Sequence, residues 1–146
     1  MQIKDTGTAV GTADGRDPTR AFDGNSDSYW QQNCRNKGDE VSFIGKQYQT
    51  THRLAKINIT TYNRDYTTNR IDVIGSNECA DWRTASWTTL LQIDGDDFNG
   101  LNFRDGGREY VIPYEQRQSF SCIGLKGTGC RTCFAVNEIV LWEELQ

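Results

Sequence analysis

The chain has little of what hydrolytic enzymes need. Its 146 residues include one histidine, His52, and no Gly-x-Ser-x-Gly motif. A hydrolytic triad requires a histidine or another tuned base beside an activated nucleophile, and His52 stands at the head of an expected strand, where we expect a surface residue. Asp94, Asp96 and Asp97 could serve as glycosidase acids, but three acids in a Gly-containing turn are typical of a solvated loop. We therefore expect no enzyme activity.

Long apolar segments and basic runs are also missing. No segment approaches the roughly 18 apolar residues of a membrane span, and residues 1–4 are too few and too polar for a signal peptide. Twenty acidic and sixteen basic residues give a net charge of -4, and no basic run exceeds two residues, which argues against nucleic acid as a partner. We expect one soluble domain over residues 1–146, which would equally suit part of a longer secreted, multidomain protein.

Helical periodicity is almost absent as well. Short alternating runs separated by Gly, Asn and Asp recur along the chain, and this pattern indicates an all-β sandwich or barrel. Residues 1–19, rich in Gly, Thr and Asp, suggest an irregular lead-in with one edge strand. Strands are expected at residues 40–44, 53–62, 70–75, 86–93, 108–112, 119–126 and 134–143.

Cysteine, in contrast, is frequent for a chain of this size. The five residues Cys34, Cys79, Cys122, Cys130 and Cys133 favour an oxidising compartment, and so an extracellular or cell-surface location. Because the number is odd, at least one thiol is free or pairs outside the chain. The Cys130-x-x-Cys133 pair precedes a strand instead of a helix, which disfavours a redox motif, and zinc would need a second close pair. Disulfides are preferred, with Cys34 joined to Cys130 or Cys133 as the hypothesis.

The segment from Arg20 to Trp30 concentrates oxygen-bearing side chains around a glycine. Asp23, Asn25, Asp27 and Ser28 can turn their oxygens toward one point, as a Ca²⁺ loop requires, and Trp30 would pin the loop to the core. An EF-hand is excluded because its sixth position is Ser28 and its twelfth is Cys34, where Gly and Glu are needed. An ordinary Asp/Asn/Gly turn remains the alternative.

Three runs carry a family resemblance. They are Ala-x-Asp-Gly-Asn-x-x-Ser-x-Trp (21–30), Ser76 with Trp87-Thr-Thr-Leu90, and Asn-Glu-Ile-x-Leu (137–141). In this order they resemble the discoidin family, a superfamily of galactose-binding-like domains that includes coagulation-factor type C domains, fucolectins and carbohydrate-binding modules. The similarity covers essentially the whole chain and implies an antiparallel β-sandwich, a jelly roll of about eight strands. The coagulation-factor branch matches less well, because no cysteine precedes Cys34 to tie the two ends of the domain together.

The resemblance implies a structural Ca²⁺ at the Asp-Gly loop, completed by a late glutamate. Carried over to this sequence, the side-chain ligands are Asp23, Ser28 and Glu138. Backbone carbonyl ligands are expected from Arg20, Asn25 and Asn137.

The segment 59–71 is the candidate ligand loop. Sugars are held by planar groups with several donors, beside an aromatic face that covers the C–H side of the ring, and Arg64, Asn69 and the tyrosines Tyr62 and Tyr66 supply such groups. The segment is also similar to galactose-type carbohydrate-binding modules, where an Arg and an Asn five residues apart hold an axial hydroxyl, and to fucolectins. That resemblance implies an aromatic partner from the last hairpin loop, which is Phe134, and a histidine after Trp30. No histidine stands there in this sequence, a departure from the galactose and fucose binders, and Asn33 is the residue expected to donate in its place.

Arg70 has a plainer interpretation, as a surface ion pair with Asp65 or Asp72. The function expected is a non-catalytic, calcium-stabilised, lectin-like module that binds glycans or glycoproteins and serves cell adhesion. Protein-protein docking, as in Doc-type members of the superfamily, is the first alternative. Membrane-surface binding is the second and is not expected, because Trp82-Arg83 is the only candidate insertion tip.

Overall fold

The computed structural model describes residues 1–12, 17–33, 41–130 and 133–144, with only the backbone of Arg64 and Cys130. Within these ranges the regular elements are strands and short 3-10 helices, with no α-helix, which confirms the all-β expectation. None of the described helices is long and apolar enough to cross a membrane. The strands are β1 Gly7–Gly11, β2 Trp30–Asn33, β3 Val41–Thr61, β4 Thr68–Ser76, β5 Thr88–Asp94, β6 Arg108–Val111, β7 Ser119–Cys130 and β8 Cys133–Glu143. The 3-10 helices are η1 Pro18–Ala21, η2 Arg64–Tyr66, η3 Gly95–Phe98, η4 Phe103–Asp105 and η5 Tyr114–Gln116.

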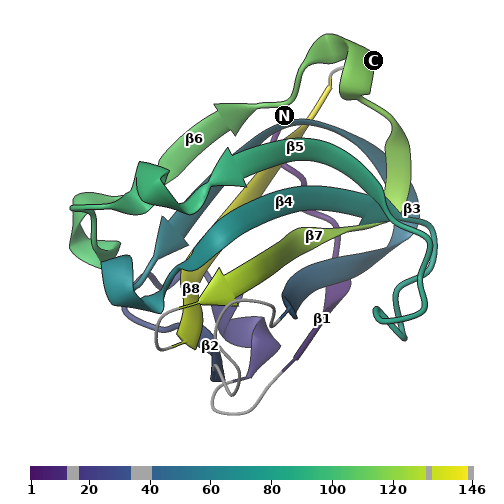
Figure 1. The fold of residues 1–146 in the computed structure, drawn as a ribbon. Coiled ribbons are helices and arrows are strands. Elements are labelled where there is room, and N and C mark those ends of the chain that lie inside the picture. Colours follow the sequence, from purple (N-terminus) through teal and green to yellow (C-terminus); the bar gives the residue numbers. More distant parts are fainter. Residues whose placement is uncertain (13–16, 34–40, 131–132, 145–146) are drawn as a thin grey trace.

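All strand pairs are antiparallel, and β3 belongs to both layers of the sandwich. Its first half joins sheet I, in the order β1-β3-β7-β4-β5. Its second half joins sheet II, in the order β2-β8-β3-β6. Figure 1 shows β5, β4 and β7 side by side in one layer, with β8 behind them.

Two expectations about strands need correction. Strands were expected at 40–44 and 53–62, whereas β3 runs without a break from Val41 to Thr61 and turns its corner at a register shift between Gln47 and His52. A bulge lets one strand leave a sheet and enter the other without a loop. Strand β2, which pairs Trp30 with Val136, was not expected, because its four residues are too few to show a pattern.

The main core lies between the two sheets. Alternate residues of facing strands point inward, and Ile57 and Leu141 from sheet II meet Ile71 and Leu125 from sheet I in one buried cluster. Trp30 is fully buried there, and its indole N–H donates to the Thr12 carbonyl. Each fully buried side chain of this size contributes about 1.5–3 kcal/mol, so Trp30 ties the preceding loop to the core as expected.

A second, smaller cluster covers the outer face of sheet I. The Phe43 ring lies over Gly45, where an added Cβ would approach the ring to 2.8 Å. Trp82 stacks on Phe43 with ring centroids 5.4 Å apart, and Trp87 lies 5.0 Å from it. Trp82 is therefore packed against the sheet instead of standing free as a membrane-insertion tip.

Candidate functional site

The Asp-Gly loop is built from consecutive side-chain-to-backbone turns. The Asp23 carboxylate accepts from the Asn25 amide at 2.9 Å, and the Asn25 side-chain oxygen accepts from the Asp27 amide at 3.0 Å. Gly24 has φ 73°, a backbone conformation that residues other than glycine rarely adopt. The glycine turn thus folds the loop back so that its amide points toward β8.

The loop meets β8 through Glu138. The Gly24 amide donates to the two Glu138 carboxylate oxygens at 2.7 and 3.3 Å. Burial raises the pKa of the Glu138 carboxyl to about 7, and the Asp23 carboxylate adds to the rise, while the Gly24 amide and the Lys46 ammonium oppose it. The exposed Asp23 carboxylate therefore lies close enough to the half-buried Glu138 carboxylate to repel it, and a bound cation would relieve that repulsion.

Asn137 holds the loop by its side chain. It is fully buried, and its Nδ2 donates to the Ser26 carbonyl at 2.7 Å. Its Oδ1 is buried and finds no hydrogen-bond partner in the described part of the chain. A buried acceptor left unsatisfied costs about 1–3 kcal/mol. We expected only a backbone carbonyl from this residue, and its side-chain contact with Ser26 was missed.

The residues present fit a hard cation. No group of three or more His, Cys, Asp or Glu able to hold a metal occurs among the described residues, so a cation here would rely on Asp23, Glu138 and neutral oxygens, which suit Ca²⁺. The contacts of the loop with β8 bring Asn25, Ser28 and Asn137 to the same place. Arg20 lies in the preceding turn, η1, with its amide bonded to the Asp17 carbonyl.

A different edge of the sandwich gathers the other candidate residues, and we call it the rim. There the end of β2 pairs with the start of β8, at Asn33 and Cys133. Tyr62 follows β3 directly, and its amide donates to the carbonyl of Ala135 in β8 at 3.3 Å. The start of β4, at Thr68, pairs with the end of β7. Segments far apart in the sequence therefore meet at the rim.

An aromatic group, the rim cluster, is centred on Tyr62. Its ring stacks on Phe103 (centroids 5.3 Å apart, 13° between planes) and on Tyr66 (5.1 Å, 21°). Tyr29 lies 4.7 Å away at 44°. All four rings are half-buried. The sequence predicted Tyr62 and Tyr66 as ligand-loop aromatics but did not predict Phe103. The Phe103 amide donates to the Tyr62 carbonyl at 3.1 Å, and this hydrogen bond brings its ring to the cluster.

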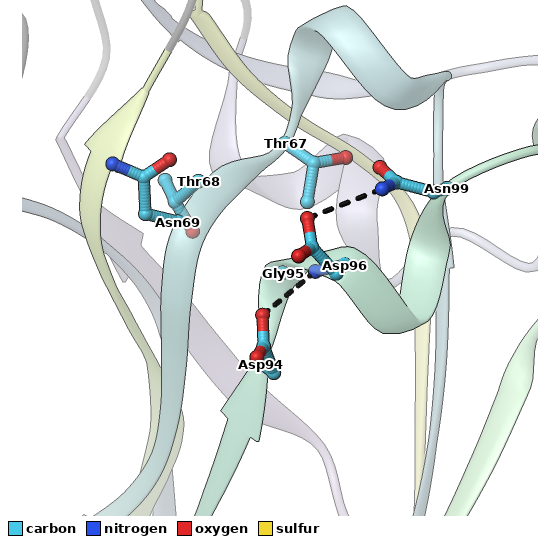
Figure 2. Close-up of a pocket in the computed structure, with 7 residues that line it drawn as sticks. All are labelled: Thr67, Thr68, Asn69, Asp94, Gly95, Asp96 and Asn99. Carbon is cyan, nitrogen blue, oxygen red and sulfur yellow. Dashed lines mark hydrogen bonds between the residues drawn. The ribbon is translucent and has the colours of Figure 1, made fainter.

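The rim also holds a hollow of about 170 Å³, the rim hollow, whose lining begins at Thr67, the residue that follows Tyr66 of the cluster in the chain (Figure 2). In Figure 2 the turn η3 stands beside the first residues of β4, and Asp96 bonds to both Asp94 and Asn99. Gly95 of η3 lies so close to β4 that a Cβ added to it would be only 1.9 Å from the Thr68 carbonyl oxygen. A glycine is therefore required at this position. The acidic turn expected to be a plain solvated loop therefore forms one wall of the hollow. Its lining is Thr67, Thr68, Asn69, Asp94, Gly95, Asp96 and Asn99.

Comparison with known proteins found neither a matching family model nor a matching curated protein. Solved structures match over almost the whole chain. One is a CBM32 of AlyQ in complex with 4,5-unsaturated mannuronic acid (TM-score 0.73, 17% identity, 99% of each chain covered). Another is chitosan-binding module 1 from a Paenibacillus sp. IK-5 chitosanase/glucanase (0.71, 16%, 97% of this chain and 98% of that one). A third is CBM32-3 from a Clostridium perfringens family 31 glycoside hydrolase (0.67, 14%, 94% and 88%).

The chain has the galactose-binding-like, or discoidin-like, fold. Its solved neighbours are carbohydrate-binding modules, including chitosan-binding and pectin-binding ones. The identities are low, so they establish the architecture, and the residues of this domain must carry any statement about its ligand.

The structure corrects one expected ligand residue. Phe134 is fully buried, with its ring 5.5 Å from Trp30 in an edge-to-face contact, so it cannot cover a sugar. It is the second residue of β8, and the strand's alternation turns it into the core. Asn33 is exposed, and its Oδ1 accepts from the Gln31 side chain. Asn69 is exposed in the rim hollow, and the side chain of Arg64 lies outside the described residues.

The cysteines also differ from expectation. Cys79 and Cys122 form a disulfide that fastens the loop after β4 to β7, and this pairing was not predicted. Cys133 is a buried free thiol whose pKa burial raises to about 11, so the hypothesis that it pairs with Cys34 is wrong. Cys34 and the side chain of Cys130 lie outside the described residues.

His52 is buried, which contradicts the surface position expected for it. Only 6% of the residue is exposed. Its Nδ1 lies 2.7 Å from Glu143 Oε2, and its Nε2 lies 2.9 Å from Asp5 Oδ2. The ring thus bridges the first residues of the chain and the end of β8, which is a structural role.

Proposed function

We propose that this domain is a non-catalytic carbohydrate-binding module that holds glycans at its rim. The observation that supports the proposal is that segments 62–69 and 94–105 supply both three of the four rings of the rim cluster and the whole lining of the rim hollow. A sugar offers an apolar C–H face and several hydroxyls, and it is bound where an aromatic surface adjoins convergent polar groups. The names of the structural neighbours support the same ligand class.

The aromatic part is held in place before a ligand arrives. Tyr62 is stacked between Tyr66 and Phe103, and the Tyr62 and Phe103 backbones are hydrogen bonded. A stacked pair contributes about 0.5–1.5 kcal/mol beyond its burial. Because this stacking already holds the rings in place, little side-chain entropy is lost when a ligand binds. A ligand therefore meets a rigid aromatic surface.

The polar part offers both donors and acceptors. The exposed Asn69 amide has both kinds of atom, and Asp94 and Asp96 each keep carboxylate oxygens beyond their internal bonds to η3 and Asn99. Galactose-type sugars are the first ligands to test, following the family resemblance of segment 59–71.

We further propose that Ca²⁺ stabilises the loop between η1 and β2. The carboxylates of Asp23 and Glu138, with neutral oxygens of Asn25, Ser28, Asn137 and the Arg20 carbonyl, would hold it. The ion would supply positive charge that offsets the two carboxylates, and it would take no part in any reaction. The Cys79–Cys122 disulfide supports an extracellular location for the domain.

A glycan array followed by calorimetric titration tests the function. We expect sugar binding that falls about tenfold in Asn69→Ala and in Tyr66→Ala, since each removes a contact worth about 1–1.5 kcal/mol. Gln49→Ala, an exposed change on β3, is the control and should leave affinity unchanged. Folded protein that binds no sugar on the array, with calcium present, would refute the proposal.

A further inference from the structure

A second hollow, on sheet I, shares two lining residues with the rim hollow. This sheet hollow, of about 280 Å³, is lined by Asn69, Arg70, Gln92, Ile93 and Asp94. Asn69 and Asp94 also line the rim hollow, so the two hollows adjoin along these two side chains. Together they run from the edge of the sandwich onto the β4–β5 pair.

The register of β4 and β5 explains the position of the sheet hollow. Arg70 stands opposite Asp94, and Asp72 stands opposite Gln92. Because residues two apart in a strand share a face, Gln92 and Asp94 point to the same side of the sheet. This side is the outer one, since Ile71 and Ile93 occupy the core.

Arg70 is fixed in this hollow by a buried partner. The Asp72 side chain is 3% exposed, and its two carboxylate oxygens lie 3.3 Å from Nε and from Nη2 of Arg70. Lys126 lies 3.9 Å from Asp72 on the other side. The Arg70 side chain is still half exposed. Its remaining N–H groups are therefore oriented before any ligand binds.

The volumes indicate the size of the ligand. Pockets for small molecules usually measure about 300–1,000 Å³. Neither hollow alone, at about 170 and 280 Å³, reaches that range, whereas the two joined do. We propose that the two hollows form one groove that binds two consecutive units of an unbranched oligosaccharide, with Asn69 and Asp94 at the junction. This proposal rests on the proposed function.

The charges of the groove indicate the class of sugar. Asp94 and Asp96 present exposed carboxylates, while the one guanidinium, Arg70, is already paired with Asp72. Bringing a uronate next to these carboxylates is unfavourable, and a neutral or amino-bearing sugar avoids that repulsion. The groove therefore selects neutral or amino-sugar chains over uronate chains.

Calorimetric titration with oligosaccharides of increasing length tests the groove. The probes are galactose, galactobiose and galactotriose; glucosamine, chitobiose and chitotriose; and digalacturonate. We expect affinity to rise about tenfold or more from the one-unit to the two-unit sugar in the neutral or the amino series, with digalacturonate weaker than both. Gln92→Ala, which touches only the sheet hollow, should remove this gain and leave one-unit affinity unchanged. Asn99→Ala, in the rim hollow, should weaken sugars of every length, and Gln49→Ala is the matched control.

The outcomes separate the two proposals. Binding of one-unit and two-unit sugars with equal affinity, or a gain that survives Gln92→Ala in a folded variant, overturns the groove and leaves the proposed function standing. Preference for digalacturonate overturns the sugar class. No binding of any probe, together with an empty glycan array, overturns the proposed function itself.

Discussion

The Gly24 amide donates a hydrogen bond of 2.7 Å to Glu138, 114 positions later in the chain. The contact joins the loop before the first strand of sheet II to the strand at the centre of that sheet. It forms because the positive φ of Gly24 turns its N–H toward β8. Asn137 repeats the connection one residue earlier through Ser26. These two bonds tie the loop to β8, so a bound cation would add stability to a loop that hydrogen bonds already attach.

Calcium should stabilise the folded domain. At a hundredfold excess over its dissociation constant a ligand adds about 2.7 kcal/mol, which for a chain of this size raises Tm by about 5–10 °C. Scanning fluorimetry with EDTA and then with CaCl₂ measures the rise. We expect Glu138→Gln to lose it, because the variant lacks one of the two carboxylates, and Glu115→Gln on η5 to keep it. An equal rise in both variants would exclude Glu138 as a ligand.

Phe134 should behave as a core residue. Its ring is fully buried against Trp30, so Phe134→Leu should lower the free energy of unfolding by about 1–2 kcal/mol, as other core truncations do. Sugar affinity of the folded variant should not change. Urea unfolding measures the stability, and calorimetric titration measures the sugar affinity. A loss of affinity without a loss of stability would show that Phe134 is a ligand-binding residue after all.

The Cys79–Cys122 disulfide should protect the outer aromatic cluster. It closes a loop across 43 positions, and the double variant Cys79→Ser with Cys122→Ser should be less stable by about 2–4 kcal/mol. Trp82 and Trp87 stack on Phe43 in this cluster, so loosening the loop should shift tryptophan fluorescence to longer wavelengths. Unchanged emission together with unchanged stability would show that packing alone holds the loop.

Cys133 should resist alkylation in the folded protein. Burial raises the pKa of its thiol to about 11, so at pH 8 only about one thiol in a thousand is ionised, compared with about a quarter for an ordinary cysteine. Reactivity should increase as pH approaches 11 or when denaturant is added. Mass spectrometry of the peptide that contains Cys133, after iodoacetamide treatment, measures this. Rapid labelling at pH 8 without denaturant would contradict the burial.

Local patterns predicted most of the strands. The alternation of Ile57 with Ile59, and of Ile139 with Leu141, is a property of a few neighbouring residues, and it survives in the fold because each alternating set faces the core. The oxygen-rich run at Asp23 is equally local. Its meeting with Glu138 was expected from the family resemblance, and the Gly24 hydrogen bond is consistent with it.

The sequence by itself therefore determined an all-β chain whose Asp-Gly loop is rich in oxygen-bearing side chains. The tertiary structure alone decided that β3 turns from one sheet into the other, that Cys79 meets Cys122, and that Phe134 faces inward. It also decided that Phe103 stacks on Tyr62 and that the acidic turn adjoins Asn69. These relationships depend on strand register and on contacts between distant segments, and a shift of one residue in register would exchange the inward and outward faces of a strand.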